Sequence, residues 1–170
     1  MEPITIRSSF TNDIPAIESL YLRTAAVEGG LARTGDEITR EYIEEFVSLS
    51  VKDGIGLVAI AGVPGRIIGE IHCYRKGVAV FRHMLSDLTI AVDPEYQGQG
   101  IGRMLFTELL SEVRKRTEIR RVELFARESN SRAIAFYSSL GFVQEGRLRG
   151  RILHRDGTME DDLVMAWYRE

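Results

Sequence analysis

A glycine-rich segment between a strand pattern and a helix pattern is the feature that most constrains this chain. The apolar run 85–92 is typical of a buried strand. Residues 97–102 then bring three glycines, and apolar residues recur every four positions from about residue 100 to residue 117, which predicts a helix. A strand that turns over glycines into an amphipathic helix belongs to a sheet with helices packed on it. The segment therefore excludes all-helical and all-strand folds.

The same two periodicities alternate along the whole chain. Strands are predicted over 4–7, 55–61, 67–74, 85–92, 121–126, 142–148 and 163–168. Helices are predicted over 14–27, 38–50, 100–117 and 130–140. The order β-α-α-β-β-β-α-β-α-β-β predicts a mixed sheet with helices on it, which is an α+β fold. The sequence contains no repeat, low-complexity segment or linker, so residues 1–170 are expected to form one domain.

The bulk properties exclude several function classes. The net charge is −3, so no global basic field indicates a nucleic acid or an anionic membrane as a partner. No apolar run reaches the ~20 residues of a membrane helix, and the first residues lack the pattern of a secretory signal, so we expect a cytoplasmic address. No residue pattern predicts a metal site. The single cysteine, Cys73, lies in an apolar strand pattern and is expected to be a buried, inert thiol.

The glycine-rich turn itself suggests an anion site. Glycine lets the backbone approach a ligand closely, and the free N–H groups at a helix N-terminus favour an anion such as a phosphate or pyrophosphate. Arg103 stands where it adds positive charge. A Walker loop is excluded because Gly102 is followed by Arg103-Met104. An ordinary tight turn between strand and helix is the structural alternative.

A second pair of residues, Asn130 and Tyr137, lies on the helix predicted after the strand 121–126. Their separation of seven residues is two helical turns and places them on one helix face. An amide and a phenol on one face can line a cleft. The structural alternative is a helix cap and a core tyrosine.

Both segments resemble motifs of the GNAT N-acetyltransferase superfamily. The turn Gln97-Gly-Gln-Gly100-Ile-Gly102 is similar to the family's acetyl-CoA signature, and the strand before it ends Ile90-Ala-Val-Asp-Pro94 as in the family. Asn130-x-x-Ala-x-x-x-Tyr137-x-x-x-Gly-Phe142 is similar to its second marker. The last stretch, 145–167, looks like the branch that holds ribosomal-protein and free L-amino-acid N-acetyltransferases. The resemblance implies a mostly antiparallel sheet of six to seven strands with helices on both faces.

The resemblance also implies the donor and its contacts. Acetyl-CoA would be the acetyl donor, its pyrophosphate held by backbone N–H groups of the turn and its pantetheine arm paired with the preceding strand, which splays from its neighbour at a bulge. By resemblance these contacts fall on Ile90, Val92, Gln97, Gly98, Gly100, Gly102 and Arg103. Asn130 would hydrogen-bond the CoA arm, and Tyr137 would protonate the departing thiolate.

The implied activity is acetyl transfer to a primary amine of a small molecule or amino acid in a ternary complex. Acetylation of a protein N-terminus or lysine is the alternative enzyme activity, and a CoA-binding sensor or scaffold without turnover is an alternative of another class. Exposed strand edges in this fold leave room for a homodimer.

The general base and the acceptor site are less determined by the sequence. Asp87 stands about where many family members carry a glutamate, and being shorter it would need a water relay. Glu70 is the other predicted catalytic carboxylate, and His72 and His83 are further candidates. We expect Glu28, Arg33 and Asp36 near the acceptor. The acidic candidates together predict a cationic or zwitterionic acceptor.

Overall fold

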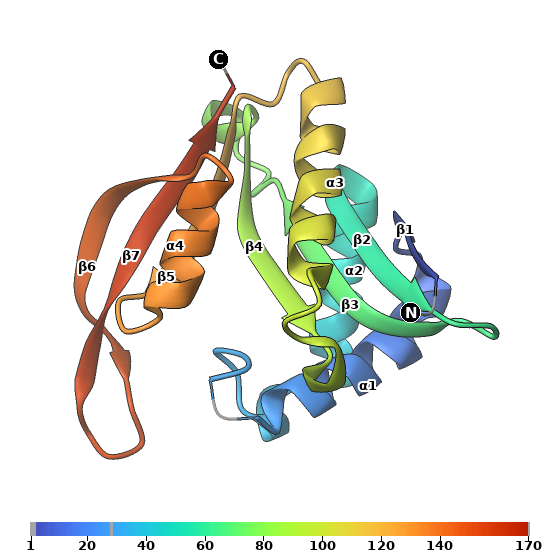
Figure 1. Ribbon diagram of the computed structural model, residues 1–170. Helices are drawn as coiled ribbons and strands as arrows, with labels where there is room; N and C mark the ends of the chain where they lie inside the picture. Colours follow the sequence, from blue (N-terminus) through green and yellow to red (C-terminus); the bar gives the residue numbers. More distant parts are fainter. Residues whose placement is uncertain (1–2, 28, 170) are drawn as a thin grey trace.

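The computed structural model describes residues 3–27 and 29–169. These residues form seven strands in one sheet, in the spatial order β1-β2-β3-β4-β5-β7-β6 (Figure 1). Within the described chain, β4 and β5 pair in parallel and the other neighbouring pairs are antiparallel. The strands are β1 (Ile4–Ser8), β2 (Gly54–Ala61), β3 (Arg66–Tyr74), β4 (Met84–Val92), β5 (Arg121–Arg127), β6 (Val143–Leu153) and β7 (Met159–Tyr168). The prediction of a mixed, mostly antiparallel sheet is confirmed.

Helices cover both faces of the sheet, as predicted. Helices α1 (Ile14–Ala25) and α2 (Arg40–Asp53) pack on one face around Val58 of β2. Helix α3 (Ile101–Lys115) packs on the other face against Leu57 and Ala59, so alternate residues of β2 serve the two cores. Helix α4 (Ser131–Ser139) follows β5 (Figure 1). Its partly buried side chains pack against the same core as α3. Both faces of the central strands are therefore buried.

Three of the boundaries that differ from the predicted ones have local causes. Helix α2 begins at Arg40 and not at residue 38, because the Thr39 hydroxyl accepts a hydrogen bond from the Tyr42 N–H at 3.2 Å and caps the helix there. Strand β6 ends at Leu153 and not at residue 148, and strand β7 begins at Met159 and not at residue 163. The added residues are largely charged and show no apolar alternation, but they pair across the hairpin, for example Arg151 with Asp162 at 3.1 Å.

Strand β4 separates from β5 after a short parallel contact. The two strands pair only at Met84–Leu85 with Arg121–Val122 within the described chain. Beyond this contact β4 continues along β3. Ser86 pairs with Tyr74 and Thr89 pairs with His72, so β4 has one more residue than β3 between these two pairs. The bulge lies at Asp87, whose φ of 55° is in the left-handed region. The bulge and the splay that the resemblance implied are both present.

Candidate functional site

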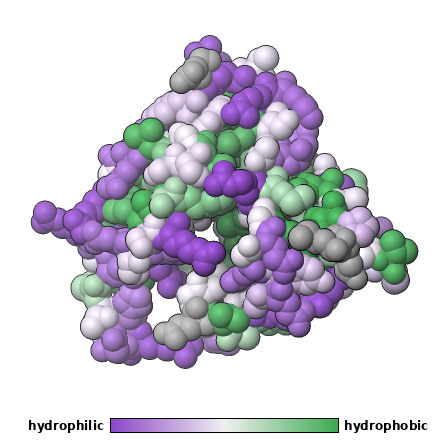
Figure 2. All heavy atoms as spheres, viewed as in Figure 1, coloured by the Kyte–Doolittle hydropathy of each residue, from purple (hydrophilic) through white to green (hydrophobic). Residues whose placement is uncertain are grey.

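A cleft of about 640 Å³ lies where β4 and β5 separate. One wall comes from β3 and β4, and the other from β5 and α4; the loop 29–33 and Tyr42 of α2 close one end. The face of the molecule drawn in Figure 2 is hollowed near its centre, with hydrophilic and hydrophobic atoms side by side. The residues singled out in the sequence that line this cleft are Arg33, His72, Asp87, Ile90, Asn130 and Tyr137.

The free edge of β4 presents backbone groups to the side from which β5 has withdrawn. The Asp93 N–H donates to the Ile68 carbonyl of β3 at 2.8 Å. Because the backbone groups of successive strand residues point to opposite sides, those of Val92 point away from β3, and so do those of Ile90. The predicted pair Ile90 and Val92 thus has the orientation that pairing with an extended ligand requires.

Two glycines of the turn have conformations that favour glycine. Gly98 has φ 76° and Gly100 has φ 84°, and a Cβ added at either would meet no atom within 4 Å. Gly102 is helical, and its Cβ would make an ordinary contact with the Ile90 side chain at 3.7 Å. The space beside Gly98 and Gly100 fits a ligand that approaches the backbone closely.

The N-terminus of α3 offers hydrogen-bond donors at this turn. The Met104 N–H bonds to the Gly100 carbonyl at 3.0 Å and is the first in the helical ladder. The N–H groups of Ile101, Gly102 and Arg103 come before that bond and have no intrahelical acceptor. Together with the helix dipole they favour a bound anion. The predicted anion site therefore has the donors that a pyrophosphate needs.

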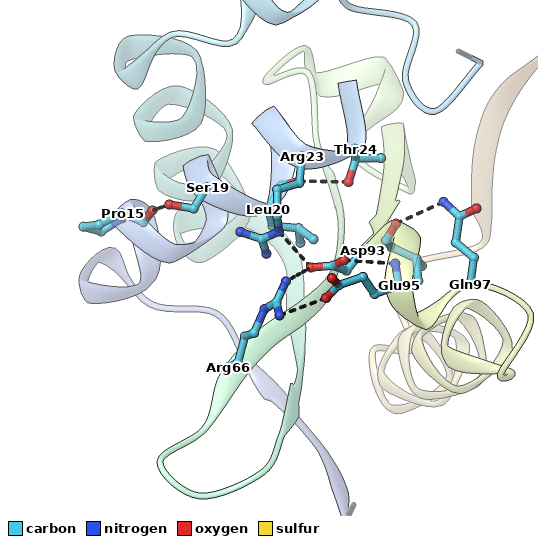
Figure 3. Close-up of polar contacts among 10 residues, drawn as sticks. Pro15, Ser19, Leu20, Arg23, Thr24, Arg66, Asp93, Glu95 and Gln97 are labelled. Carbon is cyan, nitrogen blue, oxygen red and sulfur yellow. Dashed lines mark hydrogen bonds and ion pairs between the residues drawn. The ribbon is translucent and has the colours of Figure 1, made fainter. Parts of the chain in front are cut away.

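The side chains of Gln97 and Arg103 stabilise the turn. The Gln97 amide donates to the Val92 carbonyl at 3.2 Å (Figure 3). Arg103 donates to the Ser139 hydroxyl at 3.0 Å and lies 5.3 Å from the centre of the Phe136 ring. Gln97 thus ties the turn to the end of β4, and Arg103 ties the first turn of α3 to α4.

Asp93, which the sequence analysis did not single out, anchors the same turn. Its buried carboxylate accepts hydrogen bonds from Arg23 at 2.8 Å, from Arg66 at 2.7 Å and from the Glu95 N–H at 3.2 Å (Figure 3). Burial alone raises the pKa of Asp93, but the Glu95 N–H and the two guanidinium groups hold it below its usual value. The available sequence signal was an aspartate at the end of a buried strand, directly before a proline.

Tyr137 and Asn130 line the cleft from α4. The Tyr137 ring packs 5.5 Å from Phe106 and 6.2 Å from Phe142, measured between ring centroids. Burial raises the pKa of Tyr137, so its hydroxyl keeps its proton at neutral pH. The Asn130 side-chain oxygen accepts the Ala133 N–H at 3.1 Å and caps α4. Asn130 is therefore both the helix cap of the structural alternative and a residue of the cleft.

The candidate bases occupy different environments. Asp87 lines the cleft, is 39% exposed at the side chain, and lies 3.7 Å from the Lys76 ammonium. Glu70 is fully buried, is not among the residues that line the cleft, and contacts His72, which does line it. His83 is exposed and does not line the cleft.

Cationic groups predominate at the end of the described cleft that the loop 29–33 closes. Arg33 lies 4.0 Å from the centre of the Tyr42 ring, and Arg127 donates to the Leu31 carbonyl at 3.2 Å; both arginines line the cleft. Asp36 is exposed, bonds to Thr34 at 2.6 Å and does not line the cleft. Glu28 lies outside the described residues. The acidic candidates thus supply one cleft residue, Asp87, and the sequence analysis missed Arg127 and Tyr42.

Cys73 takes no part in this site. It is buried, as predicted, and burial raises the pKa of its thiol to about 12, which disfavours the reactive thiolate. Within residues 3–27 and 29–169, no three metal-ligating side chains gather into a candidate metal site. No helix in the described part of the chain is long and apolar enough to cross a membrane.

Comparisons with known proteins agree with this geometry. A family model of the acetyltransferase (GNAT) family matches residues 15–142. The [Ribosomal protein bS18]-alanine N-acetyltransferase of Escherichia coli (strain K12) is 46% identical over 77 residues, which cover 45% of this chain and 51% of that relative. The matched segment thus spans about half the length of that relative.

Solved structures share the fold over almost the whole chain. The ribosomal-protein-S18-alanine N-acetyltransferase from Escherichia coli has a TM-score of 0.77 and 29% identity, covering 98% of this chain and 94% of that chain. A phosphinothricin acetyltransferase from Sinorhizobium meliloti, crystallised with acetyl-CoA, has a TM-score of 0.82 over 97% of this chain and 88% of that chain. At 21% identity, this second likeness concerns the fold alone. With three quarters of its length matched by the family model, the chain belongs to the acetyltransferase (GNAT) family.

Proposed function

We propose that this protein transfers an acetyl group from acetyl-CoA to a primary amine. One observation carries the proposal: the withdrawn edge of β4 leads directly into the glycine turn at the N-terminus of α3. An extended strand edge suits an amide-containing arm, and the turn suits a pyrophosphate. The fit of these two adjoining surfaces to the two parts of coenzyme A, together with family membership, supports this donor.

The donor would be held mainly by backbone groups. We assign the pantetheine arm to Ile90 and Val92, whose backbone groups point away from β3, and to Asn130 across the cleft. We assign the pyrophosphate to the turn and the first turn of α3, through Gln97, Gly98, Gly100, Gly102 and Arg103. Bound there, acetyl-CoA supplies an acetyl thioester that is already activated, so positioning of the amine can supply much of the rate.

Tyr137 is the proposed general acid. Its hydroxyl keeps its proton at neutral pH because burial raises the pKa of this phenol. A phenol in the cleft can protonate the departing thiolate, and a backbone N–H near Val92 can hydrogen-bond the thioester carbonyl. Asp87 and Glu70 stay the predicted carboxylates for removal of the amine proton, Asp87 through a water relay.

For the acceptor, the relatives favour the alternative of a protein N-terminus over a small-molecule amine. The matched relative and the solved structure are both named for acetylation of the alanine of a ribosomal protein. We therefore propose the α-amino group of a protein chain as the acceptor. The test is acetyl-CoA turnover with a peptide that starts with alanine, compared with free alanine and with alaninamide. Faster turnover of the peptide than of both small amines supports the proposal, and the reverse order contradicts it.

A free amino acid is the second candidate, because of the cations in the cleft. Arg33 and Arg127 both line it, and a guanidinium pairs well with the carboxylate that a free amino acid keeps and the N-terminal residue of a peptide lacks. Turnover of free alanine well above that of alaninamide would favour this candidate. Binding of acetyl-CoA without turnover of any acceptor would instead indicate the sensor or scaffold. The cytoplasmic address and the homodimer stay predictions.

A further inference from the structure

His72 lies on the cleft wall beside the strand edge proposed for the donor. It is 2% exposed and lines the cleft, while it sits opposite Thr89 in the ladder between β3 and β4. Thr89 immediately precedes Ile90 and also lines the cleft. The imidazole is thus placed at the level of the proposed donor, on the side of the sheet covered by α1 and α2.

One nitrogen of this ring, Nδ1, lies within hydrogen-bond distance of a buried carboxylate and 3.4 Å from the hydroxyl of the buried Tyr21. The Nδ1 atom of His72 lies 3.1 Å and 3.2 Å from the two oxygens of Glu70. The Tyr21 hydroxyl donates to Glu70 Oε2 at 2.6 Å. Burial, and next the charge of Glu70, raise the pKa of Tyr21 well above its usual value, so this hydroxyl stays a donor. With Nδ1 taken by Glu70, Nε2 is the nitrogen left to face the cleft.

Aromatic neighbours fix the plane of the ring. The His72 ring stacks on Phe46, with centroids 3.9 Å apart and planes 12° apart, and lies parallel to the Tyr74 ring at 6.1 Å. Phe46 comes from α2 and Tyr74 from β3, so two elements hold the ring. A ring held by two aromatic neighbours loses little freedom when it receives a proton, which is what a positioned base requires.

We propose that Nε2 of His72 is the base that takes the proton from the acceptor amine, and that Glu70 and Tyr21 are positioning residues for it. The proposal rests on the acetyl transfer proposed above and names its base. A carboxylate that accepts a hydrogen bond from Nδ1 keeps Nε2 free to accept a proton and stabilises the imidazolium that results. The predicted role of Glu70 is thereby indirect, through His72.

The protons of the reaction balance with these two groups. The acceptor arrives as an ammonium and leaves as an amide, so its nitrogen loses two protons while it gains the bond to the acetyl carbon. The bond from the acetyl carbon to sulfur breaks, and the sulfur leaves with the proton of Tyr137. His72 takes one proton of the nitrogen and passes it to solvent, and the other returns to Tyr137.

Asp87 is the competing base within the cleft. It is more exposed than His72 and carries an ion pair with Lys76 at 3.7 Å, which a direct role in proton transfer would have to disrupt. His72 is buried, and its contact with Glu70 is made through Nδ1, which leaves Nε2 free of that contact. The ionisable groups that contact the imidazole or act on the tyrosines near it, and so bear on any pH profile, are Tyr21 of α1, Tyr42 and Glu45 of α2, Glu70 and Tyr74 of β3, Asp87 of β4, and Arg33 of the loop between α1 and α2.

The first test compares the rates of His72→Gln and wild type across pH. Without the base, the reaction depends on acceptor that has already lost its proton, a fraction that grows with pH. We expect kcat/KM to fall by about 10² or more near pH 6 and the deficit to shrink toward pH 9, with acetyl-CoA affinity unchanged. A deficit that is the same at every pH would indicate a merely structural role and overturn the proposal. Asp87→Asn is the matched variant: a larger, pH-dependent loss there would assign the base to Asp87.

The main readout of the second test, the position of the proton on the His72 ring, needs no turnover. The chain has three histidines, so the imidazole signals of His72 can be assigned by their absence from His72→Gln. Nitrogen NMR of the wild type at neutral pH should show His72 with its proton on Nδ1 and no proton on Nε2. Glu70→Gln should change this pattern, and in rate measurements it should lower kcat while KM changes less. A proton on Nε2 in the wild type overturns the relay even if the enzyme is active. A wild type without turnover on any amine overturns the proposed function, and the relay with it.

Discussion

The Nε atom of Arg23 on α1 donates to the Asp93 carboxylate at 2.8 Å and so ties α1 to the turn before α3. Arg66 of β3 binds the same carboxylate oxygen at 2.7 Å. The carboxylate is 1% exposed, whereas the two guanidinium groups are 36% and 45% exposed. The proposed pyrophosphate turn is therefore anchored to the helix on the opposite face of the sheet and to the neighbouring strand by one buried acid.

Asp93→Asn is expected to destabilise the fold and to weaken acetyl-CoA binding. Loss of hydrogen bonds to charged groups at a buried site costs about 1.5–3 kcal/mol in the free energy of unfolding. The folded-state pKa of Asp93 is lowered, so its contribution is present above the ordinary aspartate pKa and is lost as the pH falls through the folded-state value. Urea unfolding at neutral and at low pH measures this difference.

Asp53→Asn provides the control for Asp93→Asn. Asp53 pairs with Arg75 at 3.0 Å but is 49% exposed, so its loss should change the free energy of unfolding by at most about 1 kcal/mol. Equal effects of the two substitutions at neutral pH would show that Asp93 is not an anchor of the turn.

Two substitutions at Asn130 distinguish its role as the N-cap of α4 from its proposed role as a hydrogen-bond donor to acetyl-CoA. Asn130→Asp keeps an oxygen that can accept the Ala133 N–H, so the free energy of unfolding should change little. Asn130→Ala removes the cap and should cost about 1 kcal/mol. Both remove the amide donor, and both should weaken acetyl-CoA binding, as calorimetry can measure. If Asn130→Asp binds acetyl-CoA as tightly as wild type, the amide has no role beyond the cap.

Tyr137→Phe should separate binding from chemistry. Only the hydroxyl is lost, so the contacts with Phe106 and Phe142 remain and acetyl-CoA affinity should be nearly unchanged. Turnover should fall by about 10² or more, with kcat and kcat/KM for acetyl-CoA falling together, as for a contact made in the transition state. Tyr168→Phe, on the strand β7 and outside the cleft, is the matched control. Turnover of Tyr137→Phe within a few-fold of that control would assign the protonation of sulfur to another donor.

The raised pKa of Tyr137 adds a pH dependence to this account. A general acid works only while it holds its proton, and burial raises the pKa of this phenol above its usual value near 10. Activity that depends on Tyr137 should therefore persist through neutral and moderately alkaline pH. A loss of kcat below pH 9 that Tyr137→Phe abolishes would contradict the burial seen at this residue.

The sequence predicted the features of the fold that depend on local periodicity. The buried strands and α3 follow from apolar spacing, and Ile101, Leu105 and Leu109 are buried as that spacing requires. The ends of β6 and β7 could not be predicted in this way, because ion pairs across the hairpin, such as Arg147 with Asp161 at 2.7 Å, take the place of apolar alternation there.

The site was predictable where glycines and a helix phase mark it, and not where it depends on tertiary contacts. Tyr137 and Asn130 share one helix face by their spacing, and both line the cleft. The surroundings of Glu70 depend on Tyr21, 49 residues away in the chain, and the anchor Asp93 depends on Arg23, 70 residues away. Sequence spacing carries no information about such partners, so it could not show that His72 lines the cleft and that Glu70 does not.

Calorimetric titration of acetyl-CoA into Gly100→Ala and Gly157→Ala tests whether the turn before α3 binds the pyrophosphate. Both glycines have φ 84° and open space around a built Cβ, so both variants bear a similar backbone strain of about 1–2 kcal/mol. Gly157 lies between β6 and β7, whereas Gly100 precedes α3. We expect wild-type affinity for acetyl-CoA in Gly157→Ala. We expect at least about tenfold weaker binding in Gly100→Ala, a loss of ~1.4 kcal/mol or more in the binding free energy. Equal affinity of the two folded variants would contradict this expectation, because the turn before α3 would then not be where the pyrophosphate binds.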